Sequence, residues 1–187
     1  MKSALCLLLA LFVSPSPAAE LYRLGSDNTQ IIMVVRILGV TLISARFYEL
    51  SGELVPVRRA SPSRVDVTVE TASLVCENAR WNARLLSSVW FDAQHYPQII
   101  FHSERVELDA PGGPLVSGRL TLHGQTRAFE LSVSRWVCAE HPNGADACSF
   151  DAEGHLRRSD YGLPHGILEG GDDVQIQIRG TAVPAPT

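Results

Sequence analysis

The cysteines are the residues of this 187-residue chain whose type and spacing most clearly predict chemistry. Cys138 and Cys148 flank a polar, turn-rich loop over residues 139–147, and two strands meeting through this loop would bring the thiols close together. In an oxidising compartment we expect these two cysteines to form a disulfide. Cys76 is then left over, and we expect it to be a buried free thiol. No two cysteines have the C-x-x-C spacing of a zinc site or a thioredoxin-like motif.

The histidines and serines give little indication of catalysis. None of the six histidines stands in a recognised metal or haem motif. The sequence also lacks a nucleophile elbow, a paired-carboxylate motif and a glycine-rich phosphate loop. Ser87, Ser88 and His95 could meet in space, but the sequence gives no reason to expect it. We therefore predict a protein that has no metal site and no cofactor and is not an enzyme.

Two groups of residues could instead bind a ligand. Arg158 and Asp160, with Tyr161 beside them, could hold a polar ligand head, or could form a structural pair fixing a turn that ends at Gly162. Aromatic side chains could clamp an apolar ligand, although aromatics at such spacings also form ordinary protein cores. The aromatic residues concerned are Trp81, Trp90, Phe91, Tyr96 and Phe101.

Short extended segments make up most of the chain and would position these residues. Apolar and polar residues alternate in four runs, which is typical of strands with one buried face. The apolar members are Val65, Val67 and Val69; Leu120 and Leu122; Phe129, Leu131 and Val133; and Val174, Ile176 and Ile178. Turn residues separate the runs, and residues 123–126 predict a tight hairpin. The pattern predicts an all-β antiparallel fold whose eight or so strands close into a barrel, either filled or holding one small ligand.

One short helix is expected between the strands. Trp81, Leu85 and Val89 are spaced as one stripe of a helix, and Asn78 is the expected N-cap. The proline after Tyr96 keeps that residue out of the helical region, so the chain should return there to extended structure.

The segment 31–43 is apolar on both faces of the expected strand. Alternate residues from Ile31 to Ile37 form one face, and Ile32, Val34 and Leu38 belong to the other. One face could line the barrel while the other packs under the helix. The alternative is a homodimer seam, because apolar surface on both faces of a strand must be covered.

The composition is that of an ordinary globular domain, with 45% hydrophobic and 19% charged residues. The net charge of −4 and the lack of a basic cluster argue against nucleic acid or an anionic membrane as partner. Residues 1–19 are typical of a secretory signal peptide, with Lys2 before the apolar run 4–13 and cleavage after Ala19. That run is too short to span a bilayer. We expect residues 20–187 to form one secreted domain.

Several motifs resemble those of the YceI-like family, and they occur in the family's order. They are "F-x-x-x-x-G-x-L" from Phe47, "F-D-x-x-x-Y-P-x-I-x-F-x-S" from Phe91, "G-x-L-T-x-x-G" from Gly118 and "R-S-D-Y-G" from Arg158. The chain departs from the family pattern at Ala45, Ser149 and Leu163. We expect these three substitutions to affect which ligand is bound more than which fold the chain adopts.

The resemblance implies a secreted, lipocalin-like β-barrel of eight antiparallel strands with one inserted helix. It also implies a long-chain apolar ligand, such as a polyisoprenoid, an isoprenoid quinone or a fatty amide or acid, that is carried or stored without chemical change. The residues expected to bind it are Val67, Val69, Leu85, Trp90, Phe91, Phe101, Leu120, Leu122, Phe129, Leu131, Ile176 and Ile178, together with Arg158, Asp160 and Tyr161. Two alternatives are a stress-related interaction protein with a filled barrel and a redox partner that binds quinone or haem.

Overall fold

The computed structural model of the chain describes residues 21–37, 40–55, 64–107, 110–140, 146–165 and 171–185. The predicted signal peptide, residues 1–19, lies outside the described residues. The described residues form one α-helix, α1 (Ala79–Leu86), and two short 3-10 helices, η1 (Thr71–Ser73) and η2 (Arg158–Tyr161). Their strands are β1 (Tyr22–Gly25), β2 (Thr29–Ile37), β3 (Val40–Phe47), β4 (Leu50–Val55), β5 (Arg64–Glu70), β6 (Leu74–Cys76), β7 (Gln98–Glu107), β8 (Leu115–Leu122), β9 (Gln125–Glu140), β10 (Asp146–Arg157) and β11 (Asp173–Pro184).

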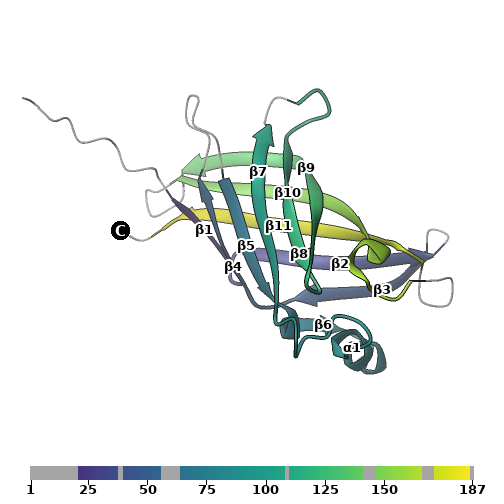
Figure 1. Cartoon of the computed structure of the whole chain (residues 1–187). Coiled ribbons are helices and arrows are strands. Elements are labelled where there is room, and N and C mark those ends of the chain that lie inside the picture. Colours follow the sequence, from purple (N-terminus) through teal and green to yellow (C-terminus); the bar gives the residue numbers. More distant parts are fainter. Residues whose placement is uncertain are drawn as a thin grey trace, which may run out of the picture.

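Eight strands close into a barrel in the order β1-β4-β5-β7-β8-β9-β10-β11, and β11 pairs back with β1 (Figure 1). The closing contact pairs Tyr22 with Pro184 and Arg23 with Val183. The other strands, β2, β3 and β6, continue the sheet from β11, which pairs with β2 over residues 174–180. All of these pairings are antiparallel. The prediction of an all-β, eight-stranded antiparallel barrel with one short helix is confirmed.

The alternating runs form strands with one face inside the barrel, as predicted. In β9, Phe129, Leu131 and Val133 are buried, whereas Glu130 and Ser132 between them are exposed. Side chains of a strand point alternately to opposite faces. Apolar residues at every second position therefore lie on one buried face and leave the other face in water.

The predicted hairpin joins β8 to β9 through the two residues His123 and Gly124. Both have positive φ values, 49° and 71°. Two-residue turns of this kind, type I′, match the twist of antiparallel strands and favour glycine. The hairpin fixes the register in which Leu122 pairs with Gln125 and Leu120 with Arg127.

Helix α1 begins at the predicted N-cap and ends earlier than predicted. The Oδ1 of Asn78 accepts hydrogen bonds from the backbone N–H groups of Arg80 (3.1 Å) and Trp81 (3.2 Å). Ser87 terminates the helix, and its hydroxyl donates to a backbone carbonyl of the last turn. Val89 therefore lies beyond the helix and is 59% exposed, so the predicted helical stripe is wrong at this residue. Figure 1 shows α1 beside β6, below the barrel.

The apolar segment 31–43 is a hairpin, because β2 ends at Ile37 and β3 runs back from Val40. The prediction that one face lines the barrel is confirmed, since Ile31, Met33 and Val35 are buried and line its cavity. Val34 on the other face is also buried, at 6% exposure. Packing of this other face under the helix and a homodimer seam both stay predictions.

Candidate functional site

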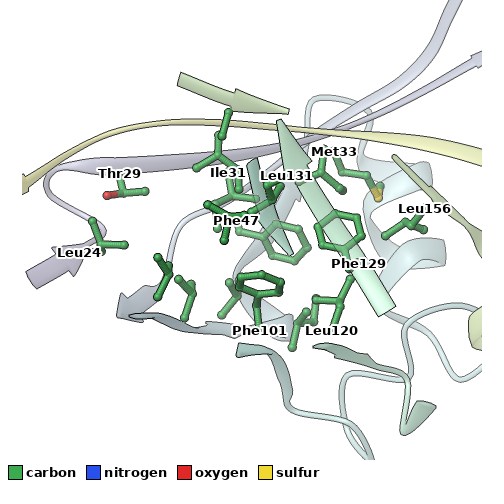
Figure 2. Close-up of a pocket in the computed structure, with 18 of the residues that line it drawn as sticks. Leu24, Thr29, Ile31, Met33, Phe47, Phe101, Leu120, Phe129, Leu131 and Leu156 are labelled. Atoms are coloured by element: carbon green, nitrogen blue, oxygen red, sulfur yellow. The ribbon is translucent and has the colours of Figure 1, made fainter. Parts of the chain in front are cut away.

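An apolar cavity of about 350 Å³ lies inside the barrel. Figure 2 shows Phe47, Phe101 and Phe129 near its centre, with Leu120 and Leu131 beside them. Phe101, Leu120, Phe129 and Leu131 come from the barrel strands β7, β8 and β9, and Phe47 comes from β3, in the part of the sheet that continues from β11. The volume is within the usual range for small-molecule sites, about 300–1,000 Å³.

Aromatic pairs stiffen the wall of this cavity. The rings of Phe101 and Phe129 meet edge to face, with centroids 6.1 Å apart, and those of Phe47 and Phe91 do so at 6.4 Å. Edge-to-face packing places the positive ring edge on the negative face of the neighbouring ring. The pairs hold large apolar surfaces in fixed positions around the open space.

A disulfide forms part of one end of the cavity. Cys138 and Cys148 are directly opposite each other on β9 and β10, with Cα atoms 4.0 Å apart, and are bonded as predicted. Both line the cavity, as do Trp136 and Phe150, whose rings pack 6.2 Å apart. Cys76 is a buried free thiol, also as predicted.

The opposite end of the cavity carries its only charged wall residue within the described part of the chain, Arg158. Arg158 directly follows β10, whose other end holds Cys148, so the two ends of this strand mark the two ends of the cavity. Arg158 is 1% exposed, and its guanidinium carbon lies 5.0 Å from the centroid of the Trp90 ring. Gly162, at φ 69°, ends the η2 turn, and the N–H of Leu163 donates to the carbonyl of Arg158. The turn predicted to end at this glycine is confirmed.

A family model described as "YceI-like domain" matches residues 22–182. The chain belongs to the YceI-like family. It is 25% identical to Protein YceI of Salmonella arizonae over 172 residues, which cover 90% of this chain and 89% of that relative. It is 29% identical to a UPF0312 protein of Vibrio campbellii over 145 residues, which cover 76% of each chain.

Solved structures of similar proteins share the barrel fold. BcnA of Burkholderia cenocepacia has a TM-score of 0.66 at 22% identity, and the match covers 84% of this chain and 96% of BcnA. The YceI protein of Campylobacter jejuni has a TM-score of 0.68 at 22% identity, covering 81% and 91%. A polyisoprenoid binding domain from Saccharophagus degradans has a TM-score of 0.56 at 15% identity, covering 90% and 99%.

Most residues predicted to bind the ligand of this YceI-like protein lie in the cavity wall. Those that do are Val67, Val69, Trp90, Phe91, Phe101, Leu120, Leu122, Phe129, Leu131, Arg158, Ile176 and Ile178. Three predicted residues, Leu85, Asp160 and Tyr161, do not line the cavity. Nor do Trp81 and Tyr96 from the predicted aromatic clamp.

Local structure explains why these three residues lie elsewhere. Leu85 is the buried residue of α1 and packs in the core, because the helix turns its apolar side to the barrel. Asp160 is exposed on η2. Tyr161 is 2% exposed in the core, where burial and the charge of Asp160 raise its pKa to about 12 and keep the phenol neutral.

The wall also contains residues outside the predicted ligand-binding set. They are Tyr22, Leu24, Thr29, Ile31, Met33, Val35, Phe47, Leu54, Val65, Ile99, Val106, Val116, Val133, Trp136, Cys138, Cys148, Phe150, Ala152, Leu156, Leu163 and Val174.

Trp136 follows the inward residue Val133 by three positions, which breaks the period of two. The register of β9 against β10 shifts between Asp151 and Ala152, and such a bulge moves later side chains to the other face.

No group of three or more histidine, cysteine, aspartate or glutamate residues could hold a metal ion in the part of the chain that the structure describes. Over the same residues, no helix is both long and apolar enough to cross a membrane.

Proposed function

We propose that this protein binds one long apolar ligand inside its barrel and does not change it chemically. The observation that carries the proposal is the apolar cavity along the barrel interior, with walls made of aromatic and aliphatic side chains from its strands. Burial of the ligand's hydrocarbon would supply the binding free energy. Enclosing about 500 Å² would contribute roughly 12 kcal/mol before the costs of ligand ordering and lost freedom.

The proposed ligand is a polyisoprenoid, an isoprenoid quinone or a fatty amide or acid. The membership of the chain in the YceI-like family supports this class, because one structural neighbour is a polyisoprenoid binding domain. An apolar wall selects its ligand by length and width more than by head group, since dispersion and burial are non-directional.

The proposed location is the periplasm, reached through a signal peptide over residues 1–19. The apolar run after Lys2 and the small residues up to Ala19 support cleavage there. The disulfide between Cys138 and Cys148 fits an oxidising compartment. In that location the protein would carry or store its ligand.

Native mass spectrometry of the protein purified from its own compartment tests the proposal. We expect one bound small molecule per chain, which organic extraction would release and identify as a long-chain lipid. A barrel that is empty as purified, and that also fails to take up added prenyl lipids or fatty acids, would contradict the proposal and favour a structural or interaction module.

A further inference from the structure

The wall of the cavity differs in polarity between its two ends. The disulfide end has apolar neighbours such as Leu24, Leu54 and Trp136. The opposite end contains the buried guanidinium of Arg158 and the indole of Trp90, which both line the cavity. A ligand with two chemically different ends would therefore meet a different environment at each end.

Trp90 places a buried hydrogen-bond donor in this wall. Its side chain is 1% exposed, and its Nε1 is buried and has no acceptor among the residues that the structure describes. Two side chains pack against the ring, because Trp81 meets it edge to face at 6.3 Å and Arg158 lies over it. Buried indole N–H groups normally find an acceptor, since leaving one unpaired costs free energy.

We propose that Trp90 and Arg158 bind the head group of the ligand, and that this head group presents an oxygen that accepts hydrogen bonds. Carbonyl, carboxylate and phosphate oxygens have this chemistry. The inference rests on the proposed function, since it concerns the same cavity. The apolar tail of the ligand then extends along β10 toward the Cys138–Cys148 disulfide.

The two side chains select for the charge and the hydrogen-bonding character of the head group. An indole N–H only donates, and a guanidinium only donates and carries a positive charge. An ammonium head group would offer another donor and another positive charge in a buried site, which is unfavourable. Asp160, the acidic residue near Arg158 in sequence, is exposed and does not line the cavity.

The test compares ligands that share one alkyl chain and differ only in the head group. Octadecanoic acid, octadecanamide and octadecylamine are titrated against the wild-type protein while the indole N–H resonances are followed by NMR. We expect the acid and the amide to bind at least tenfold more tightly than the amine. We also expect them to shift the N–H proton of Trp90 downfield, as a new hydrogen bond would.

Trp90→Phe keeps an aromatic ring at this position and removes the N–H group. We expect the variant to bind the acid and the amide about five- to tenfold more weakly, the range expected for one lost hydrogen bond, and to bind the amine as before. Trp136→Phe is the matched control, because Trp136 lines the same cavity near the disulfide. It should leave the preference among the three head groups unchanged.

The outcomes separate this inference from the proposed function. If all three ligands bind equally well and Trp90→Phe changes nothing, the head-group site is wrong and the apolar cavity still stands as the binding site. If Trp136→Phe abolishes the preference while Trp90→Phe does not, the head group lies at the disulfide end and the inference is overturned. If none of the three ligands binds and the protein also carries no lipid as purified, the proposed function itself fails.

Discussion

Phe129 is the residue at which the apolar character of the cavity can be changed most directly. It is 6% exposed, lines the cavity and packs edge to face on Phe101. In Phe129→Asp we expect loss of lipid retention, because a carboxylate would face the hydrocarbon. We also expect a loss of at least about 3 kcal/mol in unfolding free energy, the lower end for removing a buried phenylalanine. Native mass spectrometry and urea unfolding measure the two effects.

Ala128→Asp is the matched control for this variant. Ala128 precedes Phe129 on β9, and its side chain is on the exposed face of the same strand. The same charge placed one residue away should leave lipid retention intact and change the unfolding free energy by less than about 0.5 kcal/mol. A folded Phe129→Asp protein that keeps its lipid would show that the ligand does not lie against this wall.

The β9–β10 hairpin depends on the Cys138–Cys148 disulfide, which closes a loop with a sequence separation of 10. Replacing both cysteines by alanine should lower the unfolding free energy by about 3 kcal/mol. The reason is that the unfolded chain would no longer be restricted by a cross-link that closes a loop of this length. Urea unfolding with and without a thiol reductant measures the effect. A Cys76→Ala variant is the control and should still lose stability on reduction, since Cys76 is not in the disulfide.

The outer face of β10 and β11 contains a histidine that links stability to pH. His155 lies 3.0 Å from Glu153 and 3.3 Å from Asp173. Burial lowers the pKa of His155, but its hydrogen bonds with Glu153 and Asp173 outweigh this, so the pKa is raised overall. A raised pKa stabilises the folded protein below the ordinary histidine pKa, and this stabilisation is lost as the pH rises through the folded-state value.

Between about pH 5.5 and about pH 8.5, the wild-type protein should therefore lose more unfolding free energy than His155→Gln. The difference should be below about 1 kcal/mol, because His155 is 55% exposed and its partners are screened by water. Urea unfolding at the two pH values measures it. Glu153→Gln should reduce the same difference, and equal pH dependence in wild type and His155→Gln would contradict the assignment.

The sequence predicts those elements whose local pattern agrees with their final environment. The alternation in β8, the N-cap at Asn78 and the His123–Gly124 turn all follow from local chemistry, and the structure contains each of them. Leu85 illustrates the limit, because helical spacing shows that it is buried without showing whether it faces the cavity or the packed core. The bulge before Ala152 is a second limit, since it arises from pairing between two strands.

Closure of the barrel belongs to the whole molecule and follows from no single segment. The β1–β11 contact joins Tyr22 to Pro184, the two ends of the described barrel in sequence. Alternation in either segment shows that a strand has a buried face, but it does not identify the strand with which that segment pairs. Closure pairs β1 with β11 and encloses a continuous interior, in which a cavity can hold a ligand away from water.

The length of that cavity predicts how the affinity for a fatty acid depends on the length of its chain. Cys148 and Arg158 line its two ends and are separated by ten residues, or roughly 30 Å of strand at about 3.3 Å per residue. A tilt of 35–45°, typical of eight-stranded barrels, reduces this to about 25 Å along the barrel axis. Saturated fatty acids of increasing length should therefore bind more tightly, by up to about fourfold per buried methylene, until the chain fills this length. Displacement of a fluorescent fatty acid measures the series.

Beyond the cavity length, further methylenes have no apolar wall to contact, so the affinity should level off or fall. Ala152→Phe should move this limit to shorter chains, because Ala152 lines the cavity and a larger ring would occupy part of its volume. The variant should keep the fold, since the added ring enters open space. An affinity that rises without limit for every added carbon would mean that the ligand binds outside the barrel. An unchanged limit in a folded Ala152→Phe protein would mean that the chain follows a different path through it.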